Sequence, residues 1–233
     1  MNGPLQNKGA DYQMSYLIRV QIPDEPGSLG RVAEAVGLIG GNISSVDVVE
    51  AFSNGTVTDD MVVELPAGTM ADELITAAHE VEGVEVDSIR PFSGRVDRRG
   101  QIAMLASVAG ASTNSTLLAD MVNKMPQALT SSWAILLRAK NPVTRVTASN
   151  GAPADDGSNP SALPIEQARI LQPEKESWIP ESWAILDSSL IAAPLTGTDL
   201  VLVIGRVGGP DYLSSEIEHI GNLGKILGSL LKH

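Results

Sequence analysis

The chain has 233 residues, of which 43% are hydrophobic and 19% are charged, proportions that are ordinary for a globular protein. It contains no cysteine, which excludes disulfides, thiolate metal sites and cysteine nucleophiles and fits a cytoplasmic location. The net charge of −12 argues against nucleic acid and anionic membranes as partners, because phosphate binding needs a basic face. Residues 1–14 carry no regular pattern, and we expect them to form a flexible tail.

Residues 15–93 are predicted to form an α+β domain with the ferredoxin-like order βαββαβ. Residues 17–22 alternate like a half-buried strand, and apolar residues three and four apart mark the helices. Asn54-Gly55 is a strong hairpin signal, and the pair Thr69 and Asp72 resembles a helix cap. The predicted elements are, in order, strand 17–22, helix 29–39, strand 43–52, strand 57–65, a helix from Thr69 to about Gly83, and strand 84–92.

Two glycines are expected to end the first helix, and a linker is expected to follow the first domain. Gly40 and Gly41 are expected to stop the first helix, because glycine accepts the left-handed conformation of a C-terminal cap. Residues 94–101 are rich in glycine and arginine and are expected to form a linker. One face of the predicted sheet carries the helices, and a second copy of the domain is the economical cover for the other face.

Residues 102–233 are predicted to form a second domain, an antiparallel sheet flanked by an N-terminal and a C-terminal helix. Thr196-Gly197-Thr198 lies between two apolar strands and gives the best hairpin signal of this half. The last helix begins at Ser214 or Ser215, where Ser215 and Glu218 have the spacing of a capping box. The predicted elements are a helix over 102–124, bent or broken near 110–114; strands 131–138 and 143–149; a loop 150–164; a short helix 165–171; strands 188–195 and 199–205; and a final helix with the buried stripe Ile217, Ile220, Leu223, Ile226, Leu227, Leu230 and Leu231.

The most informative stretch is Asp24 to Arg31, which follows the first strand and opens the first helix. A helix start presents unpaired backbone N–H groups and a partial positive charge, which suit the carboxylate of a small ligand. An α-ammonium group needs oxygen acceptors, for which Asp24 and the Asn42 amide are candidates. Asp24 as a turn residue and Asn42 as a cap residue are the structural alternatives. Leu29 and Ile43 are candidates to select a ligand side chain by fit.

This part of the chain resembles the ACT domain, a regulatory module that binds amino acids and usually dimerises. The resemblance rests on the strand Leu17–Ile22, the turn Asp24-x-Pro26-Gly27, the helix to Ile39, and Gly41-Asn42-Ile43. It implies an effector held between two copies, against the turn after the first strand and the residues just before the second strand. The matching ligand-binding positions are Asp24, Pro26, Gly27, Ser28, Leu29, Gly41, Asn42 and Ile43.

The second half resembles a GAF domain through the strand pair Leu190–Gly205, the segment from Gly208 to Ser214, and a closing helix. It has no cysteine for a bilin, and Asn123-Lys124-Met125 is followed by Pro126 instead of continuing as a cyclic-nucleotide signature. The resemblance therefore implies a fold and no particular ligand. Trp178 and Trp183 are candidates either for the wall of a pocket in this half or for its core.

We expect no catalytic residue, no metal and no cofactor. His79, His219 and His233 lie outside any recognisable nucleophile motif, and the pairs Asp59-Asp60 and Asp155-Asp156 lack partners at metal-ligand spacing. These observations and the ACT resemblance favour a regulatory homodimer that binds a free amino acid, with the GAF-like domain as relay. Two alternatives stay open: an enzyme whose second domain acts under amino-acid control, and a purely dimerising interaction module.

Overall fold

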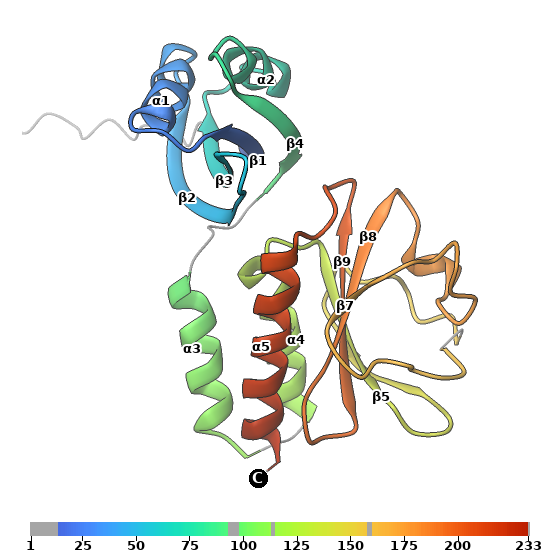
Figure 1. Cartoon of the computed structure of the whole chain (residues 1–233). Helices are drawn as coiled ribbons and strands as arrows, with labels where there is room; N and C mark the ends of the chain where they lie inside the picture. Colours follow the sequence, from blue (N-terminus) through green and yellow to red (C-terminus); the bar gives the residue numbers. More distant parts are fainter. Residues whose placement is uncertain (1–13, 93–97, 113–114, 158–159, 233) are drawn as a thin grey trace, which may run out of the picture. The chain divides into compact units, whose positions relative to one another are not determined.

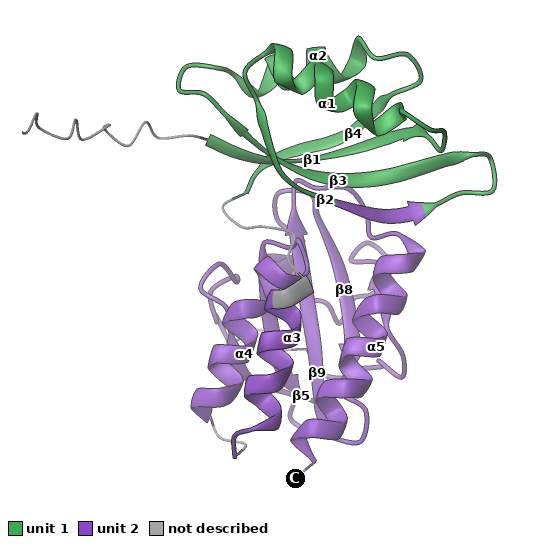
Figure 2. Ribbon diagram, turned by 90° about the vertical axis from the view of Figure 1, so that its left-hand side faces the viewer, with its two compact units in different colours: residues 1–46, 51–93 green, residues 47–50, 94–233 purple. Residues whose placement is uncertain are grey.

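The computed structural model describes residues 14–92, 98–112, 115–157 and 160–232. The chain divides into two compact units, which are residues 1–46 with 51–93, and residues 47–50 with 94–233 (Figure 2). Each unit combines helices with an antiparallel sheet, which confirms the predicted α+β fold class. The expected tail, residues 1–14, lies outside the described residues apart from Met14, which begins the first strand.

The first unit has the ferredoxin-like order that the sequence predicts. Its four strands lie in the order β2-β3-β1-β4, with β1 antiparallel to both β3 and β4, so β2 and β4 form the two edges. Both helices cover one face of the sheet (Figure 1), over a core that includes Ile18, Val20 and Ile22 of β1. The elements are β1 (Met14–Pro23), α1 (Ser28–Leu38), β2 (Asn42–Ala51), β3 (Thr56–Leu65), α2 (Ala71–His79) and β4 (Glu85–Pro91).

The two glycines after α1 do different things. Gly40 has a φ of 76° and donates its N–H to the Gly37 carbonyl oxygen at 3.0 Å, so it is the left-handed residue that ends the helix. Gly41 donates its N–H to the Val36 carbonyl oxygen at 3.0 Å, and it also allows close packing, because a Cβ there would lie 2.7 Å from Val36 Cγ1. Both glycines therefore take part in the C-terminal cap, as predicted, but only Gly40 has the left-handed conformation.

Both predicted capping boxes are displaced from the real helix starts. In α2 the Glu73 carboxylate accepts the Met70 N–H at 3.0 Å, and in α5 (Ser214–Leu231) the Glu216 carboxylate accepts the Leu213 N–H at 2.9 Å. The predicted pairs of Thr69 with Asp72 and Ser215 with Glu218 are wrong. A glutamate in the first turn reaches back to the cap amide in each case, whatever side chain the cap residue has.

The second unit is a five-stranded sheet with helices on one face (Figure 1). Its strand order is β6-β5-β9-β8-β7, and Thr196-Gly197-Thr198 joins β8 to β9 as predicted. The elements are α3 (Arg98–Ala109), α4 (Ser115–Ala128), β5 (Trp133–Arg138), β6 (Thr144–Ala148), β7 (Arg169–Leu171), the 3₁₀ turn η1 (Glu181–Trp183), β8 (Ser188–Pro194), β9 (Leu200–Val207) and α5.

Two boundaries in this unit differ from the prediction. Residues 93–97 lie outside the described residues, but α3 begins at Arg98, so the last four residues of the expected 94–101 linker are helical. The short helix expected over 165–171 is wrong, because Arg169–Leu171 forms the edge strand β7 along β8. The long helix expected over 102–124 is two helices, with the break where the glycine and polar residues near 110–114 indicate it.

Alternation divides the core of the second unit between the two faces of its sheet. Ala134, Leu136 and Ile204 belong to the cluster beneath α3, α4 and α5. Trp133 and Val203 belong to the cluster on the opposite face, which also contains Ile165, Ile179 and Trp183 from the connection between β6 and β8. That connection therefore covers the face that the helices leave open.

Glycines let α5 approach the β8–β9 hairpin closely. A Cβ on Gly228 would lie 2.3 Å from the Thr196 carbonyl oxygen, and one on Gly224 would lie 2.6 Å from the Pro194 carbonyl oxygen. Ile226 is 47% exposed and does not belong to the buried stripe in which the sequence placed it. The close contacts of the glycines turn α5 so that Leu223, Leu227 and Leu231 face the core.

A buried arginine fastens the end of β9 to the start of α5. Arg206 is fully buried and donates to Thr130 O, Pro210 O and Glu216 Oε1 at 3.3, 3.2 and 2.5 Å. Its guanidinium carbon lies 4.1 Å from the centre of the Tyr212 ring. Because Glu216 also accepts the cap amide of α5, one ion pair holds the strand, the connecting loop and the helix start together.

We predict that Arg206→Met lowers the free energy of unfolding by about 3–5 kcal/mol, because it leaves the Glu216 carboxylate, which is only 14% exposed, without its cation. Urea unfolding followed by circular dichroism measures the change. Arg138→Met is the matched control: Arg138 pairs with Asp199 at 3.4 Å on the surface, so its loss is worth less than about 1 kcal/mol. The double variant Arg206→Met/Glu216→Gln is expected to recover part of the loss; equal costs for Arg206→Met and Arg138→Met contradict this account.

Candidate functional site

The first turn of α1 has no side-chain cap. Gly27 occupies the N-cap position with a φ of 94° and contributes no side-chain hydrogen bond. Arg31 donates the first α-helical bond, to Gly27 O at 3.0 Å, so the amides of Leu29 and Gly30 precede that bond and have no acceptor within the helix. Leu29 is 39% exposed. This turn therefore offers N–H groups of the kind that bind a carboxylate.

Arg31 adds a full positive charge to the same turn. Its Nη2 donates to Ser28 Oγ at 3.0 Å, and a Cβ built on Gly27 would lie 3.9 Å from its Nη1. The guanidinium thus lies beside Gly27 and Ser28, at the start of the helix. The sequence-based site left Arg31 out, although its spacing of three residues from Ser28 puts the two on neighbouring positions of the helix surface.

A second polar group lies where β2 begins. Asn42 donates its Nδ2–H to Glu64 Oε2 across the β2–β3 pair at 3.2 Å. The carboxylate of Glu64 and the remaining amide oxygen of Asn42 are acceptors of the kind that an ammonium group needs. The sequence-based site included Asn42 and missed Glu64, which contributes the full negative charge.

These two groups lie at opposite ends of the sheet. The Asp24 amide donates to Gly55 O at 2.9 Å beside the start of β3, whereas Asn42 is bonded to Glu64 near the end of β3. Eight residues of strand separate Thr56 from Glu64, which corresponds to about 27 Å. One copy of the unit therefore does not bring the predicted turn and the predicted Gly41-Asn42-Ile43 segment together.

The remaining predicted residues fall into the same two groups. Asp24 and Pro26 are exposed in the turn before α1, and Ser28 is buried at its first position. Gly41 packs against Val36, as described above, and Ile43 is half-buried beside the core of the unit. The structure thus supports a turn group and a β2 group as separate clusters.

Strand β2 forms an edge of the sheet and runs between the ends that carry these two clusters. In the part of the chain that the structure describes, β2 pairs with a strand on one side only, and Val46 and Val48 on it are 39% and 57% exposed. An edge strand with exposed apolar side chains is a template for pairing with another strand. Among the described strands, β2, which is ten residues long, is therefore a sheet edge that runs from the β2 group towards the end of the sheet that carries the turn group.

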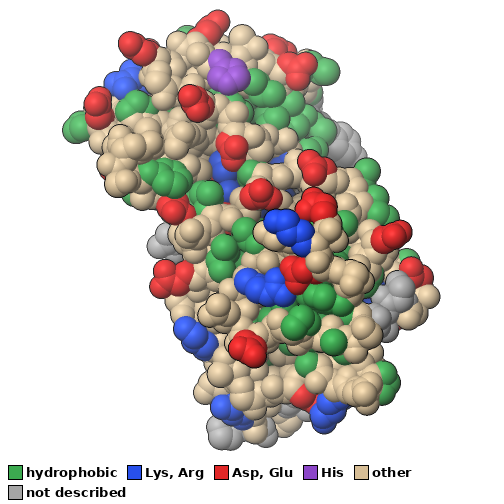
Figure 3. All heavy atoms as spheres, turned by 45° about the vertical axis from the view of Figure 1, so that its right-hand side comes forward, with side chains coloured by type: hydrophobic (Ala, Val, Ile, Leu, Met, Phe, Trp, Pro, Cys, Tyr) green, Lys and Arg blue, Asp and Glu red, His purple; other side chains and the backbone are tan. Residues whose placement is uncertain are grey.

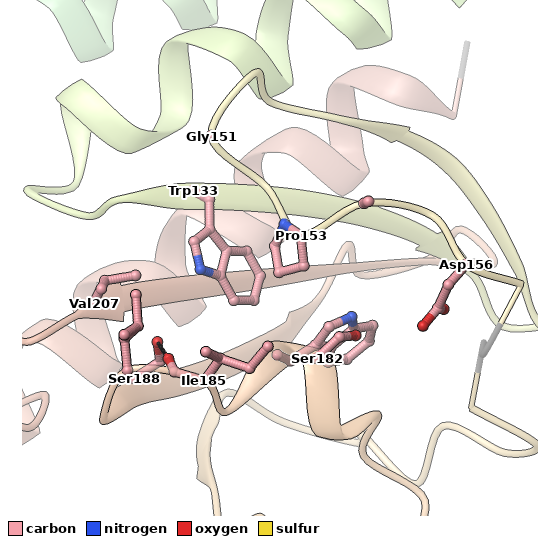
Figure 4. Close-up of a pocket in the computed structure, with 11 residues that line it drawn as sticks. Trp133, Gly151, Pro153, Asp156, Ser182, Ile185, Ser188 and Val207 are labelled. Atoms are coloured by element: carbon pink, nitrogen blue, oxygen red, sulfur yellow. Dashed lines mark hydrogen bonds between the residues drawn. The ribbon is translucent and has the colours of Figure 1, made fainter.

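A cavity of about 370 Å³ lies in the second unit, on the sheet face that carries no helix. Trp133 and Pro153 lie on one side of it, and Ser182, Ile185 and Ser188 lie on the other (Figure 4). Its volume is within the range of small-molecule sites in proteins. The complete lining is Trp133, Gly151, Pro153, Ala154, Asp156, Ser182, Trp183, Ile185, Leu186, Ser188 and Val207.

Gly205 positions the indole ring of Trp133. The two residues are directly opposite each other on β5 and β9, and a Cβ on Gly205 would lie 2.0 Å from Trp133 Cε2. The missing side chain lets the indole lie flat across β9 towards the cavity. The ring centre of Trp183 is 6.4 Å from that of Trp133, and the planes are inclined at 59°. Trp183 is therefore a wall residue, as the sequence allowed, and Trp178 is not among the lining residues.

An ion pair holds the connection that covers this face. Glu176 accepts two bonds from Arg169 of β7 at 2.8 and 2.6 Å, one from the Gln172 amide at 2.9 Å and one from Trp178 Nε1 at 3.0 Å. The bonds from Arg169 lower the pKa of the Glu176 carboxyl to about 2, against the opposing effect of burial. Trp178, predicted as a possible pocket wall, instead donates to Glu176. Glu176 and its three donor residues, Arg169, Gln172 and Trp178, form the Glu176 clamp.

The surface offers little that points to other ligands. On the face shown in Figure 3, Lys and Arg side chains lie among Asp and Glu side chains. Among the described residues there is no group of three or more His, Asp and Glu side chains arranged to hold a metal ion. No helix in the described part of the chain is long and apolar enough to cross a bilayer.

No family model matches the chain. The chain is 33% identical over 88 residues to NAD-dependent malic enzyme 1 of Bacillus subtilis (strain 168), in a match that covers 37% of this chain and 20% of that enzyme. The chain thus spans about a fifth of the length of the curated relative it matches.

Similar solved structures include a GAF domain from A. aeolicus, with 17% identity and a TM-score of 0.46 over 57% of this chain and 94% of that one. They also include the ACT domain of GTP pyrophosphokinase from Chlorobium tepidum, with 17% identity and a TM-score of 0.25 over 34% of this chain and 99% of that one. The assignment of the two units to the α+β class rests on their own strand order.

We predict that the Glu176 clamp stabilises the protein at neutral pH and fails in acid. The folded pKa of Glu176 lies below its ordinary value of 4.5, so its contribution is complete above about pH 4.5 and disappears as the pH falls towards 2. The shift sets a ceiling of about 3 kcal/mol, reduced by the partial exposure of Arg169.

Urea unfolding of the parent protein and of Glu176→Gln between pH 6 and pH 2 measures this. The difference in unfolding free energy should shrink across that interval, while the neighbouring exposed Glu174→Gln should differ little from the parent throughout. A difference between the parent and Glu176→Gln that does not change with pH contradicts the clamp.

Proposed function

We propose that this protein is a non-catalytic, cytoplasmic regulatory protein. In this proposal its first unit is an ACT-type domain that binds a free amino acid at a homodimer interface, and its GAF-like second unit relays the bound state. The observation that carries the proposal is the pair of complementary polar groups on one unit: uncapped amides with Arg31 at one end of the sheet, and Glu64 with Asn42 at the other.

A free amino acid carries both charges that these groups complement. Its α-carboxylate suits the Leu29 and Gly30 amides and the Arg31 guanidinium, because charge-assisted hydrogen bonds are strong. Its α-ammonium suits the Glu64 carboxylate and the Asn42 amide oxygen. Leu29 and Ile43 then remain for contact with the ligand side chain. Affinities in the millimolar to micromolar range correspond to roughly −4 to −8 kcal/mol, which a few such bonds supply.

A second copy of the chain would bring a turn group and a β2 group close together. If β2 pairs antiparallel with the partner's β2 about a two-fold axis near Val46, the partner's Asn42 comes to the end of the strand where Ala51 leads into the hairpin. That is the end at which Gly55 accepts the Asp24 amide. Each symmetric pairing then creates two sites, in which the turn of one copy faces the β2 start of the other.

A ligand that joins both copies acts on their association. It shifts an equilibrium only by binding one arrangement better than another. The amino acid satisfies this condition because the separated copy presents only half of its partners. In this proposal the coupling between amino-acid binding and association of the two copies is the regulatory event, and the second unit responds to it.

The enzyme and interaction-module alternatives predict different behaviour. The malic enzyme match covers 20% of that enzyme, so it fits a shared module better than a shared catalytic centre. An interaction module would dimerise without any response to amino acids. The experiment below separates it from a sensor.

We predict that at least one of the twenty amino acids raises the melting temperature of the dimer at millimolar concentration. Arg31→Gln and Glu64→Gln should each lower the affinity for that amino acid at least about tenfold, because each removes the full charge that faces one end of the ligand. Thermal-shift titration of the full chain measures both effects. Arg138→Gln, on the second unit, is the control and should leave the titration unchanged.

The dimer is tested separately. Val46→Lys/Val48→Lys places like charges on both sides of the proposed strand pair and should give monomers in analytical ultracentrifugation, with loss of the amino-acid response. A parent dimer that responds to no amino acid supports the interaction module instead. A response that survives in the monomer contradicts the shared site.

A further inference from the structure

The cavity of the second unit has a lining unlike the polar groups of the first unit. Seven of its lining residues are apolar: Trp133, Pro153, Ala154, Trp183, Ile185, Leu186 and Val207. In the part of the chain that the structure describes, no lysine, arginine or histidine lines it, and Asp156 is its single carboxylate. We propose that this cavity binds an uncharged organic molecule that combines an apolar ring with a hydroxyl group, and that it excludes carboxylates and phosphates.

Charge decides what the cavity rejects. An anion that enters it gives up hydration without meeting a lining cation, which is unfavourable in an apolar surrounding. Asp156, at one end of the cavity, contributes a carboxylate and no positive charge to the lining (Figure 4). Arg145 contacts the wall, but its Nη1 donates to the Pro153 carbonyl oxygen at 2.8 Å, so it fixes the backbone of the wall and is not itself a lining group.

The two tryptophans decide the shape of the occupant. Their ring centres are 6.4 Å apart and their planes are inclined at 59°, so the two rings form a corner. Trp133 and Trp183 already pack on each other in this tilted geometry and are 2% and 4% exposed, so a ligand ring in the cavity meets only the parts of the two indoles that line it. Burying such a ring gains roughly 25 cal/mol for each Å² of apolar surface removed from water.

Two exposed apolar residues at the mouth support an apolar occupant. Ile185 and Leu186 line the cavity and yet are 59% and 72% exposed. Leu186 and Asp187 have φ values of 59° and 52°, a conformation that non-glycine residues rarely adopt. The Leu186 carbonyl oxygen accepts the Gly208 N–H at 3.2 Å and helps to hold the strained segment in place. An apolar ligand would cover the surface that this segment leaves open to water.

The hydroxyl of the proposed ligand has partners on the same side. Ser182 and Ser188 both line the cavity (Figure 4). Ser188 Oγ donates to the Ile185 carbonyl oxygen at 2.6 Å, so its oxygen remains able to accept a bond from a ligand hydroxyl. A few such polar groups in an apolar lining fix the orientation of a ligand without requiring a charge.

Three probes of one shape test the charge preference: phenylbutanol, phenylbutyrate and phenylbutylamine. Binding to the full chain is followed by its intrinsic tryptophan fluorescence, to which Trp133 and Trp183 of the cavity lining contribute. We expect saturable binding of phenylbutanol, with phenylbutyrate weaker by at least about tenfold. Phenylbutyrate that binds as tightly as phenylbutanol overturns the proposal, as does phenylbutylamine that binds tighter than both, which would make the site a cation site.

Variants locate the binding. Ile185→Ser/Leu186→Ser removes exposed apolar surface from the mouth without disturbing the core and should weaken phenylbutanol about fivefold or more. Leu38→Ser, at an 84% exposed leucine of α1, is the control and should leave the titration unchanged. Equal binding by the parent and the double variant, or no binding of phenylbutanol up to its solubility limit, also overturns the proposal. The outcome is independent of the amino-acid response of the first unit.

Discussion

The length of β3 is the constraint on which the proposed function depends. Helix α1 carries the chain back along the sheet after β1, so β2 starts at the opposite end from the turn that opens α1. The turn group and the β2 group are therefore separated by the same strand that pairs with both β1 and β2. A ligand that needs both groups has to join two copies, and its binding is then linked to association by mass action. In the proposed function, sensing and dimerisation are one equilibrium for this reason.

Local patterns predicted the order of elements because each pattern reports a local preference. Alternation along β1, helical spacing along α1 and the Asn54-Gly55 turn all depend on residues close together in sequence. The strand Arg169–Leu171 has no such signal, because three residues become a strand only when β8 lies beside them. The predicted capping boxes differed from the real ones for a related reason. Glu73 and Glu216 accept backbone N–H groups, and this bond does not depend on which side chain the capping residue has.

The candidate site was predictable as far as its backbone features go. Gly27 and Asn42 belong to local motifs, whereas the charges beside them come from other turns and strands. Arg31 was recoverable from its spacing to Ser28 on the helix. Glu64 was recoverable by counting outward from the hairpin, since Asn42 and Glu64 are almost equally far from its turn. The cavity was not recoverable in this way, because Trp133 and Trp183 are fifty residues apart and Gly205 shapes their corner from a third segment.

The two proposed sites bind ligands of different chemistry, charged in the first unit and uncharged in the second. In the second unit, a chain of contacts connects the mouth of the cavity to the start of α5. The carbonyl oxygen of Leu186, at the mouth of the cavity, is bonded to the Gly208 amide. Two residues earlier on β9, Arg206 holds Pro210 and Glu216, and Glu216 caps α5. A ligand that relaxes the strained segment at Leu186 therefore acts on the loop that fixes the start of α5. Coupling free energies of about 1–3 kcal/mol are enough for regulation, and relief of one strained residue is of that size.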